Sequence, residues 1–201
     1  RNLLFLGFTG RNEWSTTLPE GNNSFFFPSA SLGFIFSELP FLKDNNFLSY
    51  GKIRASYAQI ANHATPYNVI NTFTSATVID GWATGDSFPF LGIAGFSPVN
   101  VLANANLKPE SLLSREFGIE VKLLQNRIGF DITYYNNQNR DLLIQVPVAG
   151  TSGYNAQYMN AATMENKGIE IMTNVVPVST PDFNWGLTVN FTKNINEVLS
   201  L

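Results

Sequence analysis

The segment EFGIEVKLLQNRIGFDITYY, residues 116–135, alternates apolar and polar side chains on both sides of a short polar interruption at Gln125 and Asn126. Alternation with a period of two is typical of a half-buried strand, and two such runs across a tight turn predict a β-hairpin. With Gln125 and Asn126 as the turn, apolar residues oppose apolar residues: Leu123 and Ile128, Val121 and Phe130, Ile119 and Ile132, Phe117 and Tyr134. A protein core and a lipid bilayer would both satisfy this apolar face.

Five further stretches help to decide between these two environments. With the hairpin strands they make seven alternating segments: Leu3–Thr9, Phe26–Phe36, Leu48–Ala58, Arg115–Leu124, Arg127–Asn136, Lys167–Val176 and Phe183–Thr192. Most are close to the ~9 to 11 residues with which a tilted strand crosses a bilayer. Helical periodicity is not convincing anywhere, and no apolar run approaches the ~18 to 20 residues of a membrane helix.

The connections between these segments alternate strictly between long and short. The long ones are 10–25, 59–114 and 137–166, and the short ones are 37–47, 125–126 and 177–182. In an antiparallel meander, alternate connections lie at opposite ends, so all long loops share one end. Outer-membrane barrels have this asymmetry, with long extracellular loops and short periplasmic turns. Structureless loops of such length are uncommon in compact soluble domains.

Charged residues gather on the polar faces of these segments, and burying them unpaired in a dry core would cost several kcal/mol per ion. The sequence therefore predicts an all-β, antiparallel transmembrane barrel segment, with lipid outside and a lumen inside. The lumen-facing charges are predicted to be Lys52, Arg54, Glu116, Glu120, Lys122, Asp131 and Glu170. The lipid-facing residues are predicted to be Phe117, Ile119, Val121, Phe130, Ile132, Ile169, Ile171, Leu187 and Val189. A soluble β-sandwich acting as a carbohydrate-binding or adhesin module, and a passive porin, are the alternatives.

Composition limits the functions open to the chain. The 201 residues carry a net charge of −3 and 12 scattered Lys and Arg, so no basic footprint for nucleic acid is present. The absence of cysteine removes disulfides and thiolate chemistry. His63 is the single histidine, which argues against a catalytic triad or a multi-histidine metal site. Glu116 and Glu120 would lie about 13 Å apart along one strand, too far for glycosidase carboxylates. No enzyme is expected.

Two features of the long loops suggest binding. Asp80-Gly-Trp-Ala-Thr-Gly-Asp86 could hold calcium through carboxylates and carbonyls, although a turn built from Asp and Gly is the favoured explanation. No other cofactor is expected. Aromatic rings in these loops could stack on sugars, or they could pack the loops on each other or on a partner that covers them. They are Trp82, Phe88, Phe90, Tyr154 and Tyr158.

One register was predicted across a long loop. Placing Leu124 near Tyr50 sets Arg54 opposite Glu120, and the hairpin sets Glu120 opposite Asp131. Arg54 would then bridge two opposed carboxylates, which otherwise destabilise a sheet. A shift by two residues stays open, because the long connection does not fix the register.

The chain resembles the SusC/RagA group of TonB-linked outer-membrane transporters over nearly its whole length. The stretches that carry the resemblance are FFFPSASLGFIFSE (25–38), LSYGKIRASYAQIAN (48–62), ANANLKPESLLSREFGIEVKLLQNRIGFDITYYNNQNRDLL (103–143), NAATMENKGIEIM (160–172) and FNWGLTVNFTKNINEV (183–198). The segments Asn104–Glu110 and Glu165–Glu170 are the most specific. At Lys108 and Pro109 a structural role is expected, with Pro109 setting the start of the following strand.

The resemblance implies a barrel of about 22 strands around a plug, in the outer membrane of a Gram-negative bacterium. It implies import of oligosaccharides or peptides, energised by the TonB complex, together with a SusD-like surface lipoprotein. Residues 1–201 would form part of one barrel domain. The chain departs from the family pattern because TonB box, plug, early strands and closing strand are not found in it, so energy coupling cannot be followed in these residues.

Overall fold

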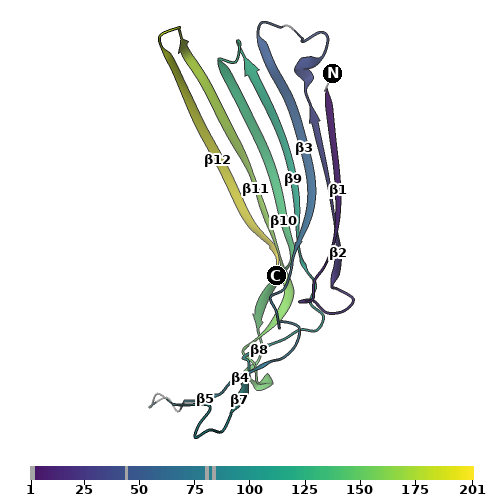
Figure 1. The fold of residues 1–201 in the computed structure, drawn as a ribbon, viewed down its shortest axis with the longest axis vertical. Coiled ribbons are helices and arrows are strands. Elements are labelled where there is room, and N and C mark those ends of the chain that lie inside the picture. The colour runs from purple at the N-terminus through teal and green to yellow at the C-terminus, as the bar shows by residue number, and fades with distance from the viewer. Residues whose placement is uncertain (1–2, 44, 80–81, 83–84) are drawn as a thin grey trace.

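The computed structural model describes residues 3–43, 45–79, 82 and 85–201. Its main element is one tall antiparallel sheet in the order β1-β2-β3-β9-β10-β11-β12, so strands that are consecutive in the sheet follow one another along the chain (Figure 1). Their bounds are β1 Leu4–Trp14, β2 Ser24–Phe34, β3 Leu48–Asn62, β9 Glu110–Leu123, β10 Ile128–Pro147, β11 Ala156–Ser179 and β12 Asn184–Ser200. All seven predicted segments are confirmed as strands.

The short elements belong to the long connections and to one turn. Strand β4 (Phe73–Ser75) pairs with β7 (Phe96–Pro98), and β5 (Thr77–Val78) pairs with β6 (Asp86–Ser87). Together they form an arm at the end of the molecule opposite the short turns (Figure 1). The last short strand, β8 (Val101–Leu102), joins the main sheet parallel to β11. As predicted, the connections 15–23, 63–109 and 148–155 lie together at one end and the others lie at the opposite end (Figure 1). The strict alternation in length is wrong, because β1 and β2 extend into the predicted loop and leave a connection, 15–23, that is shorter than 35–47 at the other end.

Helical structure in the described residues is limited to two single turns, η1 (Phe36–Glu38) and η2 (Gly150–Ser152). No helix in these residues is long and apolar enough to cross a membrane.

The predicted hairpin register is confirmed: Leu123 pairs with Ile128 and Phe117 with Tyr134. The turn is wider than predicted, because β9 ends at Leu123 and β10 begins at Ile128. Three of its four residues, Leu124, Gln125 and Asn126, have φ of 51°, 57° and 66°, which is uncommon outside glycine. Hydrogen bonds from the neighbouring connection hold them, including Leu124 N–H to the Phe47 carbonyl at 2.8 Å.

The sheet is an ordered grid with two chemically different faces. One row that crosses all seven strands is apolar throughout: Leu4, Phe34, Ile53, Ile119, Ile132, Ile171 and Phe191. Residues that share its side of the sheet are called the apolar face, and those on the other side the polar face. Because side chains alternate along a strand, this row determines on which side of the sheet the remaining residues of the regularly paired strands lie.

The strands are longer than the sequence predicted, especially β10 with 20 residues and β11 with 24 residues. They pair continuously from Ile128 to Asn139, beyond the alternating part. Alternation of apolar and polar residues along a strand requires an apolar environment on one face and a polar environment on the other. In the extension Leu143 and Tyr158 pack under the long loops, so the backbone pairing persists without the strict alternation that a lipid face and a polar face impose.

The sheet has no second layer over either face in the described part of the chain. Its buried cluster consists of Leu18, Ala64 and Leu107, packed with partly buried Phe25, Val69, Leu143 and Tyr158 under the long loops. A β-sandwich requires two sheets packed about 10 Å apart. The sandwich alternative is therefore wrong.

Candidate functional site

The polar face brings five of the seven predicted charges into two adjoining rows on strands β3, β9, β10 and β11, and Glu116 and Lys122 lie one row beyond on either side. In one row Lys52 pairs with Glu120, which pairs with Asp131. In the next row Arg54 pairs with Gly118, Gly118 with Thr133 and Thr133 with Glu170. The prediction that Arg54 stands opposite Glu120 is wrong by two residues, because the connection 63–109 leaves the register to be set by the whole sheet.

Arg54 nevertheless reaches Asp131, which lies two strands away. Its Nη2 donates to Asp131 Oδ1 at 2.6 Å and its Nη1 to Oδ2 at 3.1 Å. Nη2 also donates to the Thr133 hydroxyl at 2.5 Å. The two parallel N–H···O bonds use the planar fork of the guanidinium, which a lysine could not reproduce. The expected bridge to Asp131 is confirmed.

Gly118 makes this reach feasible, because it lies on the strand between the two charged partners. A Cβ built on Gly118 would lie 2.7 Å from Arg54 Cζ and 2.8 Å from Arg54 Cγ. Any side chain there would occupy the space through which the arginine crosses β9. The same arrangement occurs a second time in the sheet. The Tyr135 side chain passes over Gly168, and its hydroxyl donates to Asn194 Oδ1 at 3.0 Å.

Glu120 pairs with Lys122 and not with Arg54, the partner that the sequence predicted. Lys122, two residues along the same strand, places its Nζ 3.2 Å from Glu120 Oε1 and 5.2 Å from the centre of the Tyr50 ring. The opposed carboxylates Glu120 and Asp131 thus each have their own positive partner. The repulsion between them is offset by two local pairs rather than by one shared arginine.

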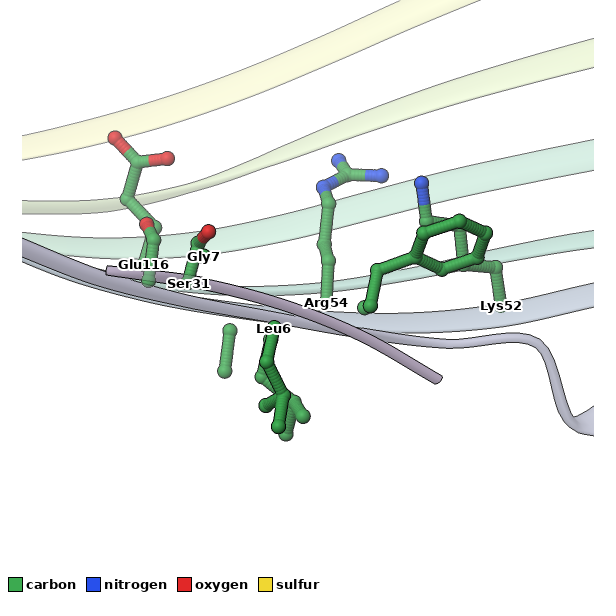
Figure 2. Close-up of a pocket in the computed structure, with 11 residues that line it drawn as sticks. Leu6, Gly7, Ser31, Lys52, Arg54 and Glu116 are labelled. Atoms are coloured by element: carbon green, nitrogen blue, oxygen red, sulfur yellow. The ribbon is translucent and has the colours of Figure 1, made fainter. Parts of the chain in front are cut away.

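Shallow hollows lie on this part of the sheet. One has a volume of 410 Å³, and Lys52, Arg54, Ser31 and Glu116 project from its polar side, whereas Leu6 points to the opposite side of the sheet (Figure 2). A hollow of 420 Å³ continues past Arg54 and Asp131 to Glu170. The wall therefore offers alternating cations, carboxylates and hydroxyls. In the described residues no group of three or more His, Cys, Asp or Glu side chains could hold a metal ion.

The stretch Asn104–Glu110 attaches the base of the long loops to the sheet. A structural role was the expectation for Lys108 and Pro109, which lie in this stretch. Leu107 is fully buried in the loop cluster. Asn104 donates to the Tyr158 carbonyl at 3.0 Å, and Glu110 accepts from the Leu143 N–H at 2.8 Å. These contacts tie the start of β9 to β10 and β11.

Asn160 also holds the base of the long loops in place, and it was not among the residues predicted from the sequence. Its Oδ1 accepts from the Lys108 N–H at 2.9 Å, and its Nδ2 donates to the carbonyls of Lys108 and Asp141 at 2.9 and 2.8 Å. Asp141 has a φ of 55° where the pairing of β10 and β11 shifts register. The only signal in the sequence was the position of Asn160 in the conspicuous NAATMENKGIE stretch.

The aromatic loop candidates are in different surroundings. Trp82 and Phe90 are exposed, at 97 % and 45 %, on the arm. Phe88 is half-buried and packs close to Gly95. Tyr154 is half-buried beside η2. Tyr158 packs against the loop cluster and its hydroxyl accepts from Gln145 Nε2 at 3.1 Å, so its ring serves the fold.

The two remaining loop predictions concern calcium and histidine. Asp80 lies outside the described residues and Asp86 begins β6, so calcium binding stays a prediction. His63 Nε2 lies 3.6 Å from Glu13 Oε2, and its ring centre lies 5.2 Å from that of Phe25. This places the histidine at the end of the wall, beside β1 and β2.

A single meandering sheet with an uninterrupted apolar face and a charged opposite face defines a section of a transmembrane β-barrel wall. The chain belongs to the TonB-dependent receptor β-barrel family, because the family model for "TonB dependent receptor-like, beta-barrel" matches residues 3–197. The described sheet is an open section and does not close into a barrel by itself.

Curated relatives place the chain near SusC-like members of this family. It is 32 % identical over 195 residues to TonB-dependent receptor P3 of Formosa agariphila, covering 96 % of this chain and 19 % of that protein. It is also 32 % identical over 202 residues to TonB-dependent receptor SusC of Bacteroides thetaiotaomicron, covering 100 % of this chain and 20 % of that protein. The chain thus spans about a fifth of the length of these relatives.

Solved structures agree in fold. The RagAB peptide transporter matches with a TM-score of 0.82 and 24 % identity, over 99 % of this chain and 21 % of that chain. The siderophore receptor PirA of Pseudomonas aeruginosa matches with a TM-score of 0.60 and 17 % identity, over 100 % of this chain and 32 % of that chain. The architecture of the section is therefore shared with receptors of very different sequence.

Proposed function

We propose that this chain is a section of the barrel wall of an active importer in the outer membrane of a Gram-negative bacterium, energised by the TonB complex. The observation that carries the proposal is the apolar row across all seven strands, from Leu4 to Phe191, with charges confined to the other face at that level. The family match favours an energised receptor over a passive porin. Plug and TonB box are proposed to lie in parts of the receptor outside this sequence.

The energetics of the two faces support lipid on one side and a wet lumen on the other. In the isolated chain Phe117 and Phe130 are 51 % and 37 % exposed. Complete burial of a fully exposed apolar side chain gains about 1.5 to 3 kcal/mol, and covering the part of each ring that is still exposed gains a share of this, so a bilayer stabilises this face as a core would. Arg54 and Asp131, in contrast, retain access to water on the lumen side.

The cargo is proposed to be an oligosaccharide or a peptide. RagAB, which shares the fold, is a peptide transporter, and the oligosaccharide case rests on the resemblance of the sequence to the SusC/RagA group. A SusD-like surface lipoprotein is the proposed partner, because the arm displays several exposed apolar side chains at the long-loop end. They include Phe73 at 69 %, Leu91 at 87 %, Ile93 at 68 % and Phe96 at 67 %.

The cargo can be tested with the complete receptor, purified in detergent, by calorimetric titration with defined oligosaccharides and defined peptides. One class should bind. Replacing Trp82 and Phe90 together by Ala should weaken that binding about tenfold, since two aromatic contacts of about 0.7 kcal/mol each amount to that factor.

The matched control is Phe41→Ala, because Phe41 is 77 % exposed in the short turn at the other end of the wall. It should leave affinity unchanged. Binding of neither class by a receptor that is otherwise folded would contradict the proposed cargo, and equal weakening by the control would contradict recognition at the long-loop end.

A further inference from the structure

The apolar face ends in positive charge on the side of the long loops. Arg115 on β9 and Lys167 on β11 lie in one row with Asn136 of β10 between them. Lys193 on β12 pairs with Ile169, one step nearer the apolar row. Farther from the long loops, the apolar face of these four strands has no charged side chain. The residues on this part of the face are Phe117, Ile119, Val121, Leu123, Ile128, Phe130, Ile132, Tyr134, Ile169, Ile171, Thr173, Val175, Leu187, Val189 and Phe191.

The spacing of the cations suits a ligand that carries more than one anionic group. Neighbouring strands lie about 4.8 Å apart, so the backbones of Arg115 and Lys167 are separated by roughly 10 Å, and those of β9 and β12 by roughly 14 Å. Arg115, Lys167 and Lys193 thus form a cationic edge, which runs along the upper limit of the apolar face.

Two of these three cations have no partner within the described part of the protein. Lys167 holds Glu165 at 2.5 Å, and Asn136 Nδ2 donates to the same carboxylate at 2.9 Å. Glu197, 3.8 Å from Lys167, is the other acidic group on this side. Arg115 and Lys193 are exposed and make no side-chain ion pair or hydrogen bond with the described residues. Their charge is left for a ligand from outside the chain.

We propose that the cationic edge binds the phosphate groups of lipopolysaccharide, the phosphorylated glycolipid of the outer leaflet. This inference rests on the proposed outer-membrane placement, in which the long loops are extracellular and the edge lies at the outer interface. Arginine pairs with phosphate through two parallel hydrogen bonds, and a lysine contributes a point charge. Tyr134 and Tyr57, which flank the edge on the apolar face, match the aromatic girdle of barrel interfaces.

The test uses the complete receptor, purified and stripped of lipid, and native mass spectrometry with added lipid A. Wild type should retain lipid A and should bind its enzymatically dephosphorylated form about tenfold more weakly, because each basic residue near an anionic lipid surface contributes about 1 kcal/mol. The double variant Arg115→Gln/Lys193→Gln should lose the preference for the phosphorylated form. Arg115→Lys/Lys193→Arg should keep it.

Lys52→Gln is the matched control, because it removes one positive charge from the polar face of the same wall and should leave lipid binding unchanged. Equal binding of both forms of lipid A by wild type, or unchanged preference in the double variant, would overturn the proposal. Stronger retention of phosphatidylglycerol than of lipid A would overturn the choice of glycolipid. The folding of each variant is checked separately by whether it migrates as a detergent-resistant barrel. A variant that does not fold is thereby distinguished from one that folds but has lost the lipid site. The comparison of the two forms of lipid A on the wild-type receptor does not depend on the variants.

Discussion

At the residue scale, a glycine and an arginine depend on one another across two strands. Arg54 reaches Asp131 because Gly118, on the strand between them, has no side chain. The benefit of the ion pair is modest, since the side chains of Arg54 and Asp131 are 37 % and 26 % exposed and water screens them. The arginine therefore orders the wall more than it stabilises it.

Replacing Arg54 by Ala should lower the melting temperature of the complete receptor by the equivalent of about 1 kcal/mol, because Asp131 and the Thr133 hydroxyl lose their donor. Substrate binding at the long loops should be nearly unchanged. The measurement is thermal unfolding followed by circular dichroism, together with a binding titration. An unaltered melting temperature combined with lost binding would instead place Arg54 on the substrate path.

Gly118→Ala should destabilise the receptor by about 1 kcal/mol, since the new methyl group displaces the arginine. In the Arg54→Ala background the same change should cost little, because the crossing side chain is gone. A double-mutant cycle on melting measures this coupling. Additive effects of the two substitutions would contradict the dependence of Arg54 on Gly118.

At the element scale, the segment that precedes β9 anchors the long loops. Leu107 is buried, and the side chains of Asn104 and Asn160 hold backbone groups of β10, of β11 and of the segment that precedes β9. The arm β4–β7 is built on this base. The specific sequence of residues 104–110 is therefore explained by the hydrogen bonds that it makes.

Asn160→Ala should release the Lys108 N–H and two carbonyls, at a cost of about 1 to 3 kcal/mol. Hydrogen exchange in residues 104–110 should accelerate while exchange in the middle of β9 stays slow. Gln157→Ala on the same strand is the control. Uniformly faster exchange throughout β9 would mean that Asn160 supports the whole sheet rather than the loop base.

At the scale of the whole molecule, one sheet separates two solvents. The absence of cysteine in these 201 residues makes single-cysteine spin labelling straightforward. In the assembled receptor, labels at Ile119 and Phe130 should respond to lipid-soluble oxygen, and labels at Glu120 and Asp131 to a water-soluble relaxer. Neighbouring positions act as each other's controls. Protection of Ile119 and Phe130 from both reagents would show packed protein on that face and contradict the barrel wall.

Expressed alone in detergent-free buffer, the 201-residue chain should aggregate. Its sheet ends at β1 and β12 with no paired strand beyond either within the described residues, and such open edges recruit other chains. The apolar face would also remain in water. Size-exclusion chromatography and sedimentation check this outcome, and a monodisperse monomer that unfolds cooperatively would contradict it.

The sequence by itself determined the strands, the hairpin register at 116–135, and the two faces of the wall. Strict alternation has only one pairing that keeps both faces consistent, and a tight turn fixes the register between adjacent strands. The same local rules explain why the ends of β10 and β11 were missed, since Leu143 and Tyr158 there pack under the long loops and strict alternation is lost.

Only the tertiary structure decided which residues meet across long connections. The pairing of β3 with β9 could slide by two residues without exposing an apolar side chain, so the pattern could not distinguish Gly118 from Glu120 as the partner of Arg54. The whole sheet settled it, and with it the reach of Arg54 to Asp131. The cationic edge of Arg115, Lys167 and Lys193 has the same origin, because four strands must be aligned before charges from distant parts of the sequence lie together.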